Sequence, residues 1–253
     1  MVESKVGWTR PKSVPFPTVW KRCVGLKEME NGQIPKFRIE DVTEDMHDDI
    51  LAFMNEFHFD KVYGSVMMRG LKLYEDPEAM KEFEGRWKRA LNLNISVVAF
   101  LDDGSEGDQR TIAGVNILNV SQRSRPETPE MYKTAKVKAI IRSLRYACGI
   151  VNIFDKYGIE EYISALGLLV HPTFRGQGLG LEILKVRYDV GRAMGLKGTM
   201  TVFSGDASQK LAYRAGMEFL SEVSYDYFKE DDGSPTYGDV ECKTMVTMGK
   251  KIE

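Results

Sequence analysis

The chain of 253 residues is 43% hydrophobic and 28% charged, and its formal net charge is −2. Such a chain buries a sizeable core as one large or two small domains, and its composition is that of a soluble globular protein rather than a disordered one. Charges of both signs are interspersed, so no basic field attracts nucleic acid or an anionic membrane surface, and we expect neither as a partner.

The first 35 residues differ from the rest of the chain. Residues 1–35 are rich in proline and tryptophan and show no sustained period. They predict an extended arm whose aromatic groups anchor on a domain formed by residues 36–253. That domain opens with a short strand at 36–40, and an amphipathic helix with acidic residues in its first turn follows Thr43.

The remaining elements alternate between helical and strand periodicity. In order they are a helix at 77–91, strands at 95–101 and 111–120, a long helix with apolar positions from Val137 to Phe154, a strand at 162–170, a helix at 178–194, a strand at 198–203, a helix at 206–214 and strands at 218–228 and 239–248. The polar segment 102–107 has hairpin-loop chemistry, and the last two strands are expected to pair. The order predicts an α/β (α+β) fold, a mixed central sheet with helices on both faces around one core.

The cysteines and the apolar segments bear on location. Cys23, Cys148 and Cys242 are odd in number and form no CxxC, so they indicate neither a disulfide framework nor a metal site. The first residues contain no apolar signal segment, and no run of 18 apolar residues occurs. We expect a cytoplasmic protein, without a metal, that acts on a small molecule.

The most informative segment is a strand end and the glycine-rich loop that follows it. These residues are Leu168, Leu169 and Val170, then Arg175, Gly176, Gln177, Gly178, Leu179 and Gly180. Without Cβ atoms at the three glycines, the backbone turns tightly and directs successive N–H groups toward one point, next to the positive end of the following helix. The loop predicts a ligand that carries phosphate.

Two common phosphate-binding loops do not fit this sequence. A P-loop needs Lys and then Ser or Thr after its last glycine, whereas Leu181 and Glu182 follow Gly180. A dinucleotide fingerprint needs its third glycine at the position of Leu181. The pattern [Q/R]-x-x-G-x-[G/A] does fit, with Arg175, Gly178 and Gly180 in register, and it resembles the coenzyme A loop of the GCN5-related N-acetyltransferases.

The second half of the chain resembles one branch of that superfamily, the insect arylalkylamine N-acetyltransferases. The segments that carry the resemblance are Asn152-Ile153-Phe154-Asp155, Ser204-Gly205-Asp206-Ala207-Ser208 and Ala215-Gly216-Met217. The resemblance spans residues 36 to 230 and implies an acetyltransferase fold with splayed central strands. It also implies acetyl-CoA as cosubstrate, and direct attack by the primary amine of a small arylalkylamine-like substrate in a ternary complex.

The resemblance assigns cofactor contacts along the strand and the loop. Where strands 162–170 and 198–203 splay, the pantetheine arm is expected on the backbone of Leu168, Leu169 and Val170. The pyrophosphate is expected on the amides of residues 177–180, with Gly176 and Arg175 beside it. Ser208 corresponds to a family position that faces the cofactor, although a helix-start hydroxyl is an equal explanation.

The reaction needs a base for the ammonium and an acid for the thiolate. The resemblance implies an acidic base at the start of the first helix, where Glu44 and Asp45 both fit and neither is preferred; acidic residues there also simply favour the helix N-terminus. His47 and His58 are alternative bases.

The acid is less defined, because a tyrosine common in the superfamily is missing. Ala212 stands at its position, and Tyr213 is rotated by about 100° around the helix. Ser204, Ser208 or a water is expected to serve instead.

The amine side also departs from the family. Asp60-Lys61-Val62 replaces a frequent Asp-Glu-Pro tripeptide and removes an acidic group. Residues expected to frame the acceptor pocket are Phe57, Phe59, Tyr63, Met67, Met68 and Tyr74. The alternatives are a polyamine, agmatine or protein-amine acetyltransferase, and a protein that binds acyl-CoA without turnover.

Overall fold

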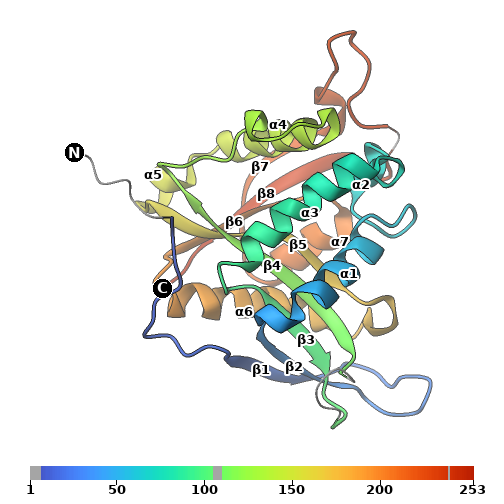
Figure 1. Ribbon diagram of the computed structural model, residues 1–253, viewed down its shortest axis with the longest axis vertical. Helices are drawn as coiled ribbons and strands as arrows, with labels where there is room; N and C mark the ends of the chain where they lie inside the picture. The colour runs from blue at the N-terminus through green and yellow to red at the C-terminus, as the bar shows by residue number, and fades with distance from the viewer. Residues whose placement is uncertain (1–6, 105–109, 239) are drawn as a thin grey trace.

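One mixed sheet of eight strands runs through the molecule, with helices on both of its faces (Figure 1). The structure is a computed structural model that describes residues 7–104, 110–238 and 240–253. Along the sheet the strand order is β1-β2-β3-β4-β5-β6-β8-β7. The strands are β1 Val19–Val24, β2 Lys36–Asp41, β3 Val97–Leu101, β4 Ile112–Gln122, β5 Glu161–Val170, β6 Gly198–Phe203, β7 Glu218–Ser224 and β8 Thr244–Lys251.

The helices divide into two layers. They are α1 His47–His58, α2 Val66–Gly70, α3 Pro77–Leu91, α4 Ala135–Gly149, α5 Ile153–Tyr157, α6 Leu179–Ala193 and α7 Asp206–Arg214. Apolar residues of α1 to α4 form one buried cluster with side chains of β3, β4 and β8, and α6 forms a second cluster with residues of β2, β3 and β4. The α/β fold with helices on both faces is confirmed.

Three elements differ from the sequence prediction. The long helix expected to reach Phe154 is wrong: α4 ends at Gly149, and α5 begins after Asn152, whose side chain accepts hydrogen bonds from the amides of Phe154 and Asp155. The apolar period continues across this break, so periodicity alone does not reveal the new helix start. Helix α2 was not predicted, and β8 covers Thr244–Lys251 rather than 239–248. Residues 105–107 of the expected hairpin loop, and residue 239, lie outside the described residues.

The N-terminal arm contributes a strand to the sheet. β1 pairs antiparallel with β2. The buried carboxylate of Asp41 accepts hydrogen bonds from the indole of Trp20 (2.7 Å) and the amide of Thr18 (2.9 Å), and it forms an ion pair with Arg10 (2.9 Å). A boundary between arm and domain near residue 35 stays a prediction, because this network spans it.

The sheet opens between the parallel strands β5 and β6. β4 and β5 pair at nine positions, whereas the parallel strands β5 and β6 pair only at Ile163 and Thr199. Beyond that point the two strands diverge toward their C-terminal ends, and the splay expected from the sequence is confirmed. Leu168, Leu169 and Val170 therefore lie where β5 has no partner on its β6 side.

Candidate active site

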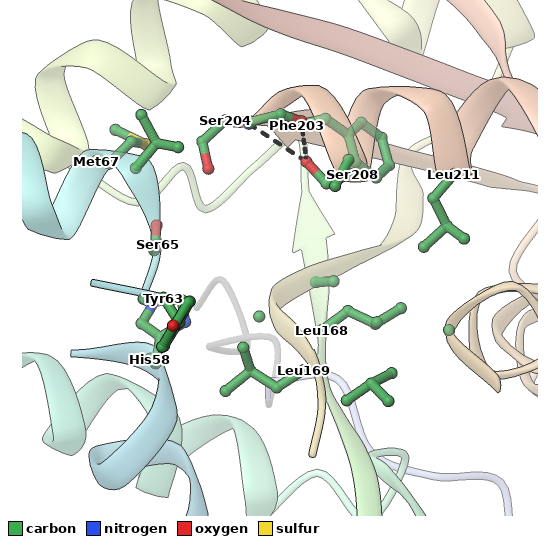
Figure 2. Close-up of a pocket in the computed structure, with 18 of the residues that line it drawn as sticks. His58, Tyr63, Ser65, Met67, Leu168, Leu169, Phe203, Ser204, Ser208 and Leu211 are labelled. Carbon is green, nitrogen blue, oxygen red and sulfur yellow. Dashed lines mark hydrogen bonds between the residues drawn. The ribbon is translucent and has the colours of Figure 1, made fainter. Parts of the chain in front are cut away.

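The splay between β5 and β6 leads into a cleft of about 830 Å³. Its walls come from the end of α1 and the segment through α2, from the end of β5, from the glycine loop and from the start of α7. Figure 2 shows His58, Tyr63, Ser65 and Met67 along one side, Leu168, Leu169 and Leu211 along the other, and Ser204 and Ser208 across one end. Elements distant in sequence thus converge on one space.

The glycine loop has the geometry of an anion cradle. Gly176 and Gly178 have φ angles of 76° and 78°, in the left-handed region that favours glycine. α6 begins directly afterwards at Leu179, and no side chain caps its first amides. These amides and the positive end of a 15-residue helix remain for a ligand, so the residues present fit a diphosphate. Arg175, Gly176, Gly178, Leu179 and Gly180 all line the cleft.

Gln177 has a different environment from its neighbours in the loop. Its side chain is buried, and its carbonyl oxygen accepts hydrogen bonds from the amides of Leu26 (3.0 Å) and Lys27 (3.1 Å). This pair of bonds holds the arm against the loop, so Leu26 lines the cleft. The Nζ atom of Lys27 lies 3.1 Å from the point where a Cβ of Gly176 would project. Lys27 thus brings a positive charge beside the glycine loop, and sequence patterns missed it because the arm shows no period.

His58 is the histidine that the fold brings to the cleft. Its side chain is 8% exposed, and neither ring nitrogen has a hydrogen-bond partner among the described residues. Burial, followed by the charge of Arg86, lowers the pKa of His58 to about 4, so the ring is neutral at physiological pH. The side chain packs against Phe83 and Trp87, and a Cβ at Gly167 would lie 3.7 Å from Nδ1.

The two acidic residues predicted as bases, Glu44 and Asp45, lie outside the cleft. Both are exposed on the turn before α1, and neither lines the cleft. A hydrogen bond from Thr43 lowers the pKa of Asp45. His47 does not line the cleft either. Among the described residues the acidic side chains that do line it are Asp206 and Glu241. Asp206 belongs to a segment that carries the family resemblance, but the sequence patterns indicated a site role for neither residue.

The two predicted serines differ in their hydrogen bonds. The hydroxyl of Ser208 donates to the carbonyl of Gly205 (2.7 Å) and accepts from its amide (3.3 Å), so it stabilises the start of α7. The hydroxyl of Ser204 makes no hydrogen bond to a described residue. Both serines line the cleft, whereas Tyr213 is 54% exposed and does not. Of the two serines, Ser204 is therefore the one whose hydroxyl has no hydrogen-bond partner among the described residues and remains available as a donor.

The expected acceptor residues are only partly brought together. Tyr63, Met67 and Met68 line the cleft. Phe59 is buried in the core, and Phe57 packs on Phe53. Tyr74 packs against the same core from a half-buried position.

Cys242 also lines the cleft, through a contact absent from the sequence prediction. Its thiol donates to Asp206 (3.0 Å). Burial, and then this hydrogen bond, raise the pKa of Cys242, so the sulfur remains protonated. A protonated thiol is a poor nucleophile. The described residues contain no cluster of three or more His, Cys, Asp or Glu side chains suited to a metal, and none of their helices is long and apolar enough to cross a membrane.

Solved structures provide close matches to this fold. A protein designated arylalkylamine N-acetyltransferase 7, from the yellow fever mosquito Aedes aegypti, matches with a TM-score of 0.87 and 32% identity over 97% of this chain and 100% of its own. Arylalkylamine N-acetyltransferase 2 from Aedes aegypti has a TM-score of 0.75 at 18% identity over 86% and 99% of the two chains. A Drosophila melanogaster polyamine N-acetyltransferase that forms N-acetylagmatine has 0.72 at 15% over 85% and 99%. The last two show the fold alone. No family model and no curated protein matches the sequence.

The splayed sheet and the glycine cradle define an N-acetyltransferase of the GCN5-related fold, for which acetyl-CoA is the cosubstrate. The identity of 32% over nearly the full length refines this class. The chain belongs to the family of the insect arylalkylamine N-acetyltransferases.

Proposed function

We propose that this protein transfers the acetyl group of acetyl-CoA to the primary amine of a small arylalkylamine-like substrate, by direct attack in a ternary complex. The observation that carries the proposal is the single cleft that joins the glycine cradle to an apolar wall containing Tyr63, Met67 and Met68. An apolar wall of this kind suits an aromatic amine. The protonated Cys242 supports direct attack over a covalent enzyme intermediate.

The cradle would hold the cosubstrate by its phosphates. Acetyl-CoA supplies the activated acyl group as a thioester. The amides at the start of α6 would bind the diphosphate, with Arg175 and Lys27 adding positive charge. The unpaired backbone of residues 168–170 would bind the pantetheine amides in the manner of an added strand. Residues 176–180 and Ser208 keep their predicted contacts in this arrangement.

His58 is the group best placed to receive the amine. Its neutral ring has a free acceptor nitrogen in a cleft wall that also includes Val62, and the adjacent Lys61 stands where the frequent tripeptide of the family has its glutamate. We assign it to orient the attacking nitrogen by accepting a hydrogen bond from it and to relay the proton that this nitrogen loses, as the C–N bond forms, to solvent water in the open cleft. Glu44 and Asp45 remain predicted bases that would have to act from outside the cleft.

Ser204 is the proposed acid. Its unpartnered hydroxyl would donate to the departing sulfur, with Ser208 holding the turn that positions it. The location implied by the three free thiols is the cytoplasm.

One specific observation favours a second acceptor class. Asp206 and Glu241 bring carboxylates to the cleft, and a carboxylate is what a second ammonium of a polyamine or agmatine would need. Acceptor panels that include tyramine, agmatine, a polyamine and an N-terminal peptide separate these classes. Tight coenzyme A binding without turnover of any amine would support the non-catalytic alternative.

The experiment measures thiol release from acetyl-CoA across that panel, together with calorimetric titration of coenzyme A. We expect the arylalkylamine to give the highest kcat/KM.

Gly178→Glu should abolish coenzyme A binding, because it adds a side chain and a negative charge at a left-handed position. His58→Phe should lower kcat by about a hundredfold and leave the coenzyme A affinity unchanged. Glu44→Ala and Asp45→Ala are matched tests of the other bases. Unaltered coenzyme A binding in Gly178→Glu would refute the cradle assignment.

A further inference from the structure

One arginine of the cleft is buried without a carboxylate partner among the described residues. Arg187, in the third turn of α6, is 1% exposed and lines the cleft together with Thr201 of β6. Burial lowers the pKa of Arg187 to about 10, so the guanidinium is still charged at neutral pH. No ion pair joins Arg187 to a carboxylate of the residues that the structure describes. A positive charge in this position lacks compensation.

Another buried arginine of the cleft, Arg86, has the partner that a buried charge usually has. Its guanidinium donates two hydrogen bonds to the carboxylate of Glu127, with distances of 2.8 and 2.7 Å. Buried charges are normally paired in this way, because neutral dipoles replace water incompletely. The contrast between the two arginines makes Arg187 exceptional.

The contacts of Arg187 leave part of its hydrogen-bonding capacity open. Nε and one terminal nitrogen donate to the amide oxygen of Asn116, at 3.3 and 3.1 Å, and the other terminal nitrogen donates to the hydroxyl of Thr201 at 2.8 Å. A guanidinium has five N–H donors, so one remains on each terminal nitrogen. Both partners are neutral, and Asn116 is itself fixed by a bond to the carbonyl of Gly167.

The position of Arg187 excludes the diphosphate as its partner. Eight residues separate it from the first residue of α6, a distance of about 12 Å along the helix. Asn116 belongs to β4 and pairs with Leu168 on β5, and Thr201 belongs to β6, so the guanidinium bridges the strands on either side of β5 at the level of residues 167–168, where the pantetheine arm is expected. An anion there belongs to a reacting substrate rather than to the coenzyme A phosphates.

We propose that Arg187 forms a carboxylate subsite at the floor of the cleft, and that one of the two substrates carries a carboxylate to it. The carboxylate belongs either to the free end of a dicarboxylic acyl group or to an amino-acid acceptor. A carboxylate matches the two remaining N–H groups, which can bind both of its oxygens. This inference rests on the proposed acyl transfer and extends its substrate class.

Two pairs of substrates, in each of which only one member carries the carboxylate, test the proposal and separate the two sources. Succinyl-CoA against butyryl-CoA, with tyramine as acceptor, tests the acyl end. Tyrosine against tyramine, with acetyl-CoA as donor, tests the acceptor. We expect the carboxylate-bearing member of one pair to have a kcat/KM at least about tenfold higher, as a charged hydrogen-bonded pair provides.

The variants assign that preference to Arg187. Arg187→Met should abolish the preference by raising KM more for the carboxylate-bearing member of the pair than for the neutral one. Arg187→Lys should retain part of it, because the charge remains without the planar fork. Arg192→Met, on the same helix but exposed and paired with Asp189, is the matched control and should change nothing.

The proposal is overturned if the wild type prefers the neutral member of both pairs. It is also overturned if Arg187→Met lowers kcat/KM by the same factor for both members of each pair, because that result assigns Arg187 a structural role alone. Failure of the proposed function gives a different result, since no amine would then be acylated from acetyl-CoA by the wild type.

Discussion

His58 differs from the other two histidines of the chain in that both of its ring nitrogens are buried without a hydrogen-bond partner among the described residues, whereas in His47 this is so of Nε2 alone. The nitrogens of His58 are thus buried without partners, whereas His171 accepts a hydrogen bond from the amide of Thr173 at 3.3 Å. Such an orphan is costly to the folded protein unless a ligand completes it. The aromatic neighbours Phe83 and Trp87 keep the ring neutral, which is the state that accepts a hydrogen bond from an amine.

Acid should destabilise the wild type through His58. The folded pKa, about 4, lies below the ordinary value of 6.5, so the unfolded chain binds the extra proton first. The stabilising contribution is complete above pH 6.5 and is lost as the pH falls toward 4, by about 3 kcal/mol in the free energy of unfolding. Urea denaturation of the wild type and His58→Phe at pH 7 and pH 4 measures this difference. Equal losses in both proteins would mean that His58 titrates normally.

The two serines of the cleft should separate activity from stability. Ser204→Ala removes an unpartnered hydroxyl, so we expect kcat to fall by about a hundredfold with no change in melting temperature. Ser208→Ala removes the bonds to Gly205 and should cost about 1 kcal/mol of unfolding free energy. Turnover and thermal melting of both variants provide the comparison. A stable, fully active Ser204→Ala would reassign the acid to water.

At the scale of elements, the strand of the arm and the glycine loop act as one unit. Gln177 links them by accepting two amide hydrogen bonds from residues 26 and 27, which places Lys27 over Gly176. Helix α6 supplies the positive end of its dipole at the same place. The positive charge beside the glycine loop therefore comes from two segments that are 150 residues apart in the chain.

Removing the charge of the arm should weaken cosubstrate binding modestly. Lys27→Ala loses an exposed cation beside the loop, so we expect the Kd of coenzyme A to rise about threefold to fivefold at low salt, and less at high salt. Lys12→Ala removes an exposed lysine of the same arm away from these contacts and serves as the control. Calorimetry at two salt concentrations makes the measurement. Equal affinities for both variants would remove Lys27 from the phosphate site.

At the scale of the whole molecule, the arm and the domain share one sheet and one buried network. Asp41 is fully buried and joins Arg10, Thr18 and Trp20 to β2. Side chains of the arm, including Trp8 and Trp20, pack against the same cluster as α6. The contacts that stabilise β1 and β2, at one edge of the sheet, thus include residues near the start of the described part of the arm.

Loss of this network should destabilise the entire fold. Asp41→Ala leaves the Arg10 guanidinium and the Trp20 indole without their partner, and we expect about 3 kcal/mol lower unfolding free energy in a single transition. Denaturation followed by tryptophan fluorescence and by circular dichroism tests this. Two separate transitions, with only the first shifted, would support the division at residue 35 that the composition predicts.

Local sequence was enough to predict the backbone geometry of the loop and most elements. The glycines around Gln177 predict left-handed turns and an anion site, because no other residue adopts those angles easily. Helix α3 and strand β6 have the bounds that capping and periodicity predict. These features depend on neighbours within a few residues, and such neighbours are visible in the chain.

Tertiary packing decided what the cleft contains. His58, Arg187 and Cys242 line the cleft from three separate elements or segments, Lys27 lies beside the glycine loop, and no spacing in the sequence relates them. Burial shifts the pKa values of the first three side chains, and this burial arises only when distant strands and helices exclude water. Glu44 and Asp45 remain exposed at the surface, because the turn before α1 forms from local residues and does not bring these side chains to the cleft.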